Sequence, residues 1–421
     1  MVNTMKEHSL KSCMMWNALG NAIYLACQWL ITILVANIGN FKDAGLLSIA
    51  MSVSATFQTF ALFGIRNYQV SDIDGKYSDG TYVSFRIITC ILALLCCAFF
   101  SAISGYTLDT VLCIILFMLF RLAENFSDVL HGILQKNGRL DIVGKSFVIK
   151  GVGILTLFLV GYSTTKSLSF GLLLMSAFSI LSTVFFDSVM TMKIKSFGLD
   201  LKFKNSFSLA KETLPLCIYL FLSAATVTVP KLILEKNSSE EILGIYSSIF
   251  APAILIQAVL GYIYTPFAPK LSEYRFNRET KKFITLSLKI TAAICIFTVA
   301  MLALALLFGE FALTLLFGDD ILPYIYLLFP ILLAIATLAI FGFLCMLAIV
   351  LRNILFLIIG TSLGFASTII ITLPMINKFG INGTSYSLIV STMISNAILI
   401  IGIIYTLYTE DKKNRKTQEK D

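Results

Sequence analysis

Long apolar runs recur from one end of this chain to the other, and short polar breaks separate them. A helix needs about 20 apolar residues to cross the hydrocarbon core of a bilayer, and we count twelve runs of roughly that length among the 421 residues. The predicted spans are residues 14–38, 44–66, 81–104, 109–133, 142–162, 168–192, 213–234, 242–266, 283–308, 321–347, 354–376 and 384–407. The sequence therefore predicts an all-α, polytopic membrane protein with twelve transmembrane helices.

The composition excludes several classes of protein. Charged residues make up 13% of the chain, about half the share of ordinary soluble domains, so a soluble multidomain protein is ruled out. The nine cysteines lie mostly inside apolar runs without a C-x-x-C, and there are two histidines, so we expect neither a disulfide framework nor a metal site. No phosphate-binding G-x-x-x-x-G-K-[ST] motif occurs. With short connections throughout, we expect no enzyme, no catalytic residue and no resident cofactor.

Basic residues predict the orientation of the spans. Lys and Arg outnumber Asp and Glu by 32 to 24, an excess that the positive-inside bias of membrane proteins produces without a nucleic-acid partner. With both termini in the cytoplasm, most of these basic residues fall on the cytoplasmic side. The outer side then holds Lys42, Lys166, Lys231, Lys236 and Lys378. We expect a multi-pass protein of the plasma membrane with both termini cytoplasmic.

The longest connection between spans is basic, and it divides the chain into two sets of six spans. Six is an even number, so the two halves have the same orientation, as in transporters built from parallel repeats. We expect an N-terminal six-helix lobe at 1–195, a basic cytoplasmic linker at 196–212, a C-terminal six-helix lobe at 213–409 and a charged cytoplasmic tail at 410–421. The two lobes are expected to surround a central cavity.

The fourth predicted span carries the strongest functional signal. At about 100° per residue, Arg121, Glu124, Asp128, His131 and Gln135 share one face within an arc of roughly 80°. An ionisable side chain at the centre of a bilayer costs at least about 2.5–3.5 kcal/mol, so this face is expected to line a hydrated cavity. The alternative is a helix end whose side chains satisfy one another, since Arg121 and Glu124, and Glu124 and Asp128, are spaced for local pairing.

Polar and charged side chains in other spans add candidates. Asn21, Tyr24 and Gln28 share a narrow arc of the first span, either lining the cavity or joining helices by hydrogen bonds. Further charged side chains at membrane depth are Arg66, Arg86, Lys150, Asp187, Lys231 and Lys289. If the cations point inward, the cavity of the first half is positive and suits an anionic ligand, because guanidinium and ammonium groups pair with phosphate oxygens. Alternatively, Arg86 and Lys150 extend toward the cytoplasmic interface.

The chain also resembles a known family. The segment MMWNALGNAIYLACQWLITILVANIG, followed by DAGLLSIAMSVSATFQTFALFGIRNYQVSD, is similar to Wzx-type polysaccharide flippases. These belong to the multidrug/oligosaccharidyl-lipid/polysaccharide exporter superfamily. The resemblance extends over the whole chain and is clearest at residues 14–75. It implies translocation of undecaprenyl-pyrophosphate-linked oligosaccharide units across the plasma membrane by ion-coupled alternating access, for cell-surface polysaccharide biosynthesis.

Together with this resemblance, the polar residues receive expected roles. The residues expected to bind the substrate are Arg121, Arg66, Arg86, Lys150 and Lys231 for the pyrophosphate and Asn21, Tyr24 and Gln28 for the sugar. The residues expected to bind a coupling Na⁺ or H⁺ are Glu124, Asp128, His131 and Asp187. Membrane lipids, a polysaccharide polymerase and glycosyltransferases are the expected partners.

Two other functions compete with the flippase. A multidrug/cation antiporter of the same superfamily would favour acidic cavities, whereas this chain is richer in cations at membrane depth. A polytopic membrane glycosyltransferase or polysaccharide polymerase needs acid and base groups, usually on a sizeable exposed loop. Here the acidic residues of the short outer loops are scattered or in small clusters.

Overall fold

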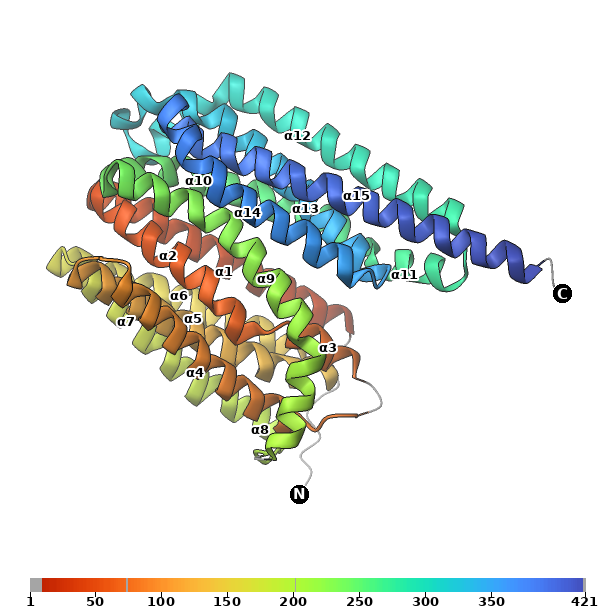
Figure 1. Ribbon diagram of the computed structural model, residues 1–421. Helices are drawn as coiled ribbons and strands as arrows, with labels where there is room; N and C mark the ends of the chain where they lie inside the picture. The colour runs from red at the N-terminus through yellow and green to blue at the C-terminus, as the bar shows by residue number, and fades with distance from the viewer. Residues whose placement is uncertain (1–9, 73–74, 201, 419–421) are drawn as a thin grey trace. The chain divides into compact units, whose positions relative to one another are not determined.

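The computed structural model describes residues 10–72, 75–200 and 202–418, which fold into helices joined by short turns (Figure 1). Within these described residues, twelve helical segments are long and apolar enough to cross a membrane, which confirms the predicted fold class of a polytopic all-α protein. The chain divides into two compact units, one ending at Ala224 and the other beginning at Ala225. The first nine residues of the predicted N-terminal lobe and the last three of the predicted tail lie outside the described residues.

The first unit surrounds one helix, α5. Its elements are α1 (Leu10–Ile38), α2 (Phe41–Leu62), α3 (Ile65–Ser71), α4 (Asp79–Ile103), α5 (Leu108–Lys136), α6 (Leu140–Thr165), α7 (Leu168–Ser182), a π-helical turn η1 (Thr183–Ser188), α8 (Val189–Ile194) and the first part of α9 (Phe203–Asn237). Helices α2, α4 and α7 pack against α5, while α1 and α7 pack against α6. Polar side chains on α5 therefore meet other helices of this unit.

Polar residues at the turns explain why several helices begin where they do. The side chains of Asn40, Ser78, Thr107 and Ser167 each accept a hydrogen bond from a backbone N–H in the first turn of the helix that follows. Such caps satisfy backbone donors that a helix leaves unpaired at its N-terminus. The turn chemistry of the sequence thus fixes the starts of four spans to within a few residues of the predicted positions.

The predicted second span, residues 44–66, does not continue to its predicted end. Helix α2 ends at Leu62, and Phe63 and Gly64 have φ angles of 49° and 68°. A left-handed residue directly after a helix commonly ends it, because its backbone N–H bonds back to a carbonyl oxygen of the last turn. Phe63 N donates in this way to Thr59 O at 2.9 Å. Arg66 consequently lies on the separate short helix α3, so the prediction that the second span extends to residue 66 was wrong.

The predicted basic linker is held against the first unit. Asp200 accepts hydrogen bonds from Asn205 Nδ2 and Thr81 Oγ1, both at 2.8 Å. These bonds, with one from a backbone N–H, hold the pKa of the Asp200 carboxyl below its usual value. Further along, Glu212 Oε1 lies 2.7 Å from Lys76 Nζ. The second half of the linker is part of α9, which continues past the division between the two units.

The second unit consists of the rest of α9 and the helices that follow. These are α10 (Glu240–Tyr264), the 3₁₀ turn η2 (Thr265–Phe267), α11 (Ala268–Phe276), α12 (Thr280–Phe317), the 3₁₀ segment η3 (Asp319–Leu327), α13 (Leu328–Val350), α14 (Ile354–Phe379) and α15 (Asn382–Gln418). Helix α13 packs against α10 and α15, and α14 packs along α15. Because α15 continues to Gln418, most of the predicted tail is helical.

Two glycines let α1 and α6 approach closely. A Cβ atom built on Gly20 would lie 2.1 Å from the carbonyl oxygen of Gly144, and one built on Gly144 would lie 2.1 Å from the carbonyl oxygen of Trp16. Backbone atoms cannot yield to such contacts as a flexible side chain can. Small residues at helix crossings are the usual means of bringing backbones together in a membrane.

We expect Gly144→Ala to destabilise the first unit by about 1–3 kcal/mol, because the added methyl group must push α1 and α6 apart. The measurement is the melting temperature of the purified protein in detergent. Gly261→Ala is the matched control, since its Cβ would meet nothing within 4 Å in α10 and should leave the melting temperature unchanged or raise it. Equal melting temperatures for the Gly144 variant and the wild type would contradict the close crossing.

Candidate functional site

The charged face of α5 begins with a pair of side chains that also contacts α1. Arg121 Nη1 donates to Glu124 Oε2 at 2.8 Å, one helical turn away. The second carboxylate oxygen of Glu124 accepts a hydrogen bond from Gln28 Nε2 of α1 at 3.0 Å, and Gln28 also bonds to the hydroxyl of Tyr24. The local pairing considered from the sequence is therefore present, and the polar stripe of α1 joins it.

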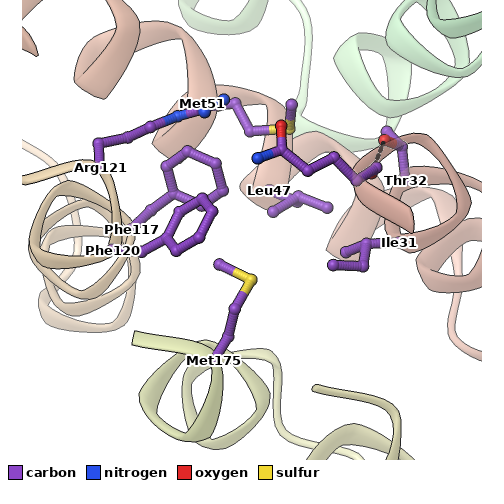
Figure 2. Close-up of a pocket in the computed structure, with 9 residues that line it drawn as sticks. Ile31, Thr32, Leu47, Met51, Phe117, Phe120, Arg121 and Met175 are labelled. Atoms are coloured by element: carbon purple, nitrogen blue, oxygen red, sulfur yellow. Dashed lines mark hydrogen bonds between the residues drawn. The ribbon is translucent and has the colours of Figure 1, made fainter. Parts of the chain in front are cut away.

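Arg121 also borders a small pocket inside the first unit (Figure 2). The pocket is lined by Gln28, Ile31, Thr32, Leu47, Met51, Phe117, Phe120, Arg121 and Met175, from α1, α2, α5 and α7. The guanidinium carbon of Arg121 lies 5.2 Å from the ring centre of Phe117 and 5.4 Å from that of Phe120, within the range of cation–π attraction. The pocket has room for about one water molecule, and Arg121 is the charged member of its lining.

Further along α5, Asp128 lies between two arginines. Its Oδ2 atom is 3.1 Å from Arg86 Nη2 of α4, and its Oδ1 atom is 3.6 Å from Arg66 Nη1 of α3. Arg86 is fully buried and also donates to the carbonyl oxygen of Ala61, whereas Arg66 reaches Gln135 Oε1 at 2.9 Å. Two cations share one carboxylate here, so the cluster keeps a positive charge.

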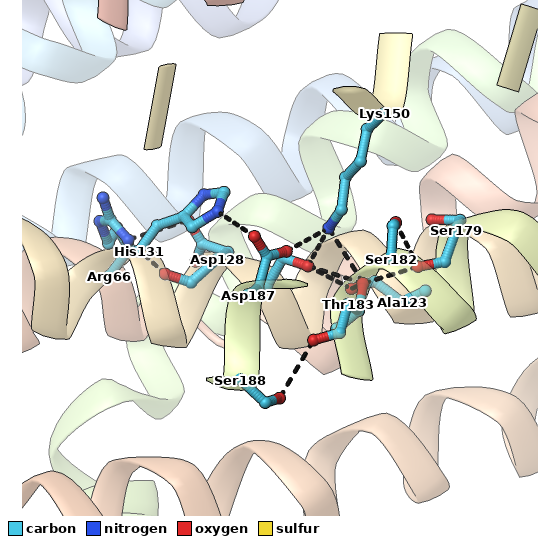
Figure 3. Close-up of polar contacts among 11 residues, drawn as sticks. Arg66, Ala123, Asp128, His131, Lys150, Ser179, Ser182, Thr183, Asp187 and Ser188 are labelled. Carbon is cyan, nitrogen blue, oxygen red and sulfur yellow. Dashed lines mark hydrogen bonds and ion pairs between the residues drawn. The ribbon is translucent and has the colours of Figure 1, made fainter. Parts of the chain in front are cut away.

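A third cluster is almost inaccessible and joins α5, α6 and η1 (Figure 3). Lys150 Nζ lies 2.6 Å from Asp187 Oδ2, and His131 Nε2 lies 3.4 Å from Asp187 Oδ1. The lysine also donates to the hydroxyls of Ser127 and Thr183, which bond to each other at 2.9 Å. Lys150 and Asp187 are at most 4% exposed, so each charge depends on the other and on these hydroxyls.

The position of Asp187 follows from a local irregularity that the sequence does not signal. Residues Thr183–Ser188 form a π-helical turn, and Ser188 Oγ donates to the carbonyl oxygen of Thr183 at 3.1 Å. Such wide turns are frequent at functional sites. The hydroxyls of Ser127 and Thr183 were not predicted as members of a site, because serine and threonine occur on many of the predicted spans.

Most of the predicted site residues thus come together in the first unit, in three neighbouring clusters along α5. Asn21 lies half-buried on the same helix as Tyr24 and Gln28. Lys231 is the exception, because it belongs to the second unit, where its Nζ lies 4.3 Å from the ring centre of Phe250. Among the residues that the structure describes, no group of three or more His, Cys, Asp or Glu side chains could hold a metal ion. The functional roles of all these residues stay predictions.

Comparison with known proteins adds information from sequence and from fold. No family model matches the chain. The chain is 28% identical over 305 residues to the capsular polysaccharide biosynthesis protein CapF of Staphylococcus aureus, covering 71% of this chain and 75% of that protein. Its fold is similar to an inward-facing multidrug resistance transporter of the MATE family, with a TM-score of 0.68, 14% identity, and coverage of 95% of this chain and 99% of that one. It is also similar to the lipid II flippase MurJ, with a TM-score of 0.70, 14% identity, and coverage of 94% and 89%.

These similarities confirm the resemblance predicted from the sequence. The chain shares its fold with MATE transporters and with the lipid II flippase MurJ, and it resembles a capsular polysaccharide biosynthesis protein in sequence. The twelve apolar helices make it a multi-pass membrane protein.

We expect Asp187→Asn to destabilise the protein by about 3–5 kcal/mol, because it leaves the buried Lys150 ammonium without a counter-charge. Replacing both partners, with Lys150→Met and Asp187→Leu, should recover most of the loss, since no buried charge remains. Melting temperatures in detergent measure both variants, with Asp109→Asn at the exposed start of α5 as a control. An Asp187→Asn protein as stable as the wild type would show that the ion pair is not a structural requirement.

Proposed function

We propose that this protein is a flippase that moves polyprenyl-pyrophosphate-linked oligosaccharide units across the plasma membrane, coupled to an ion gradient, for surface polysaccharide biosynthesis. The sequence similarity to a capsular polysaccharide biosynthesis protein and the fold shared with a lipid II flippase support it. A lipid-linked sugar diphosphate does not cross the hydrocarbon core without a protein, because moving charged groups into hydrocarbon costs a large free energy. Transport by alternating access between the two lobes meets this need.

The observation that carries the proposal is the state of Arg121. A guanidinium has five N–H donors, and Glu124 takes one on Nη1. The buried Nε atom of Arg121 has no hydrogen-bond partner among the described residues. A planar guanidinium with donors to spare suits the oxygens of a diphosphate. The pocket beside it is too small for that group, so binding requires the surrounding side chains to move apart.

The neighbouring polar residues of α1 suit the sugar end of such a substrate. Tyr24 and Gln28 already bond to each other beside Glu124, and Asn21 lies one turn away on the same helix. Amide and hydroxyl groups both donate and accept hydrogen bonds, as the hydroxyls of a saccharide do. We assign these three residues to the sugar and the cations Arg66, Arg86, Lys150 and Lys231 to the anionic part of the path.

Ion coupling is proposed to act through the carboxylates that restrain these cations. Glu124 holds Arg121 at 2.8 Å. A proton or Na⁺ bound by Glu124 would weaken this pair and free the guanidinium for the diphosphate. Asp128 is paired with Arg66 and Arg86 in the same way. Asp187, which also contacts His131, is paired with Lys150. Each carboxylate therefore links the binding of a cation to the availability of a positive side chain.

Arg121→Ala should lower transport about tenfold or more, the effect expected for losing a hydrogen bond to a charged group. The assay uses proteoliposomes containing a fluorescent polyprenyl-pyrophosphate oligosaccharide, whose exposure on the far leaflet is read with an impermeant quencher. Arg352→Ala, which removes an exposed arginine of the second unit, is the matched control. Wild-type transport by the Arg121 variant would remove this residue from pyrophosphate binding.

Glu124→Gln should make transport insensitive to an imposed Na⁺ or H⁺ gradient while slower exchange continues, because the amide keeps the size of the side chain without its charge. The same proteoliposomes measure transport with and without each gradient. Asp109→Asn, on the exposed first turn of α5, should respond like the wild type. If the Glu124 variant kept the full response to the gradient, coupling would have to reside elsewhere.

A multidrug/cation antiporter is the second candidate, and the similarity to MATE transporters in fold is consistent with it. The lining of the pocket favours the flippase, because its charged residue is the cation Arg121, which repels a cationic drug.

A further inference from the structure

A second pocket, unrelated to the α5 clusters, lies where α11 meets α12. Its lining consists of Tyr274, Lys281, Lys282, Thr285, Leu286 and Lys289. The segment from Lys270 to Lys289 contains six basic and two acidic residues, a net charge of +4 within a chain whose total is +8. Half of the excess positive charge is therefore concentrated in a short stretch of the second unit.

Each of the two acidic residues of this segment is paired with a lysine of the same segment. Glu273 pairs with Lys270 at 3.0 Å, and Glu279 pairs with Lys282 at 2.7 Å. Lys281 and Lys289 are exposed, and neither has an acidic partner among the described residues. Two uncompensated ammonium groups thus face the same pocket.

The length of α12 places this pocket at the depth of lipid headgroups. Its 38 residues extend about 57 Å at 1.5 Å per residue, against about 30 Å for the hydrocarbon core. Residues 290–309 carry no charge, and this stretch alone is about 30 Å long. Lys289 then stands at the edge of the hydrocarbon, and the first turns of α12 lie among the headgroups.

The surface next to the pocket is apolar and exposed. Leu288, Ile296 and Val299 of α12 are 64%, 70% and 66% exposed. In the 18-residue apolar stretch that makes α12 a candidate span, 11% of the residues are buried. This is the smallest share among the twelve candidate spans of the described residues. Acyl chains can cover this face along its length, directly beside a positive pocket.

We propose that this pocket binds the phosphate of an anionic diacyl phospholipid, whose acyl chains lie along the exposed face of α12. Lys281 and Lys289 are two helical turns apart, and their long flexible stems let both ammonium groups reach a headgroup held between them. Basic pockets beside membrane-spanning helices bind such headgroups. The positive-inside bias puts the site at the cytoplasmic leaflet. A free phosphate would use the charge of the pocket but not the apolar face next to it.

The test is titration of the purified full-length protein, in neutral detergent, with a fluorescent phosphatidylglycerol. Lysines near an anionic lipid surface contribute about fivefold each to affinity, so Lys281→Gln with Lys289→Gln should weaken binding about 25-fold. The matched control, Lys193→Gln with Lys195→Gln, removes the same charge from two exposed lysines elsewhere and should change binding less than twofold. A fluorescent phosphatidylcholine, which has no net charge, should bind both variants and the wild type equally weakly.

Three results would overturn the proposal. Equal weakening in the two double variants would mean that the lipid responds to total charge alone. Unchanged binding in the Lys281 and Lys289 variant, with its elution profile on gel filtration as for the wild type, would place the lipid elsewhere. Displacement of the phosphatidylglycerol by inorganic phosphate at equal concentration would show that the pocket takes a free anion and not a lipid.

Discussion

A charge inside the membrane has to meet an opposite charge or water, and this requirement organises the first unit. Helix α5 carries Arg121, Glu124, Asp128 and His131 on one face. Arg121 pairs with Glu124 on the same helix, and the other three meet side chains from neighbouring elements. Gln28 approaches from α1, Arg86 from α4, and Asp187 from η1. Leaving any of these charges unpaired in a low-dielectric interior would cost several kcal/mol, so the arrangement of helices about α5 follows from its polar face.

The clusters along α5 differ in how accessible their side chains are. Lys150 and Asp187 are sealed among hydroxyl groups, an arrangement that fixes η1 against α6. Arg121 and Glu124 are 19% and 15% exposed and border a pocket. Because Glu124 restrains Arg121, a change in charge on the carboxylate alters how many guanidinium donors are available. In the proposed function, this one residue pair connects an ion with an anionic substrate.

Much of the fold could be predicted because it depends on local properties of the sequence. Apolar length gave twelve spans, and the helical period placed Arg121, Glu124, Asp128 and His131 on one face. The partners could not be predicted, because a charge paired inside the protein and a charge facing water avoid lipid equally well. Arg86 is an example, since its burial against Asp128 depends on how α4 packs on α5. The left-handed Phe63 and the π-helical turn holding Asp187 were likewise not predicted.

The identity of the transported molecule is the central claim, and selectivity of the wild-type protein tests it most directly. Proteoliposomes would be supplied with equal amounts of a polyprenyl-pyrophosphate oligosaccharide and a cationic dye, and the movement of each across the bilayer measured in the same vesicles. A flippase with Arg121 beside its pocket should move the lipid-linked sugar and leave the dye where it is. Movement of the dye without the lipid-linked sugar would contradict the flippase and favour a cation antiporter.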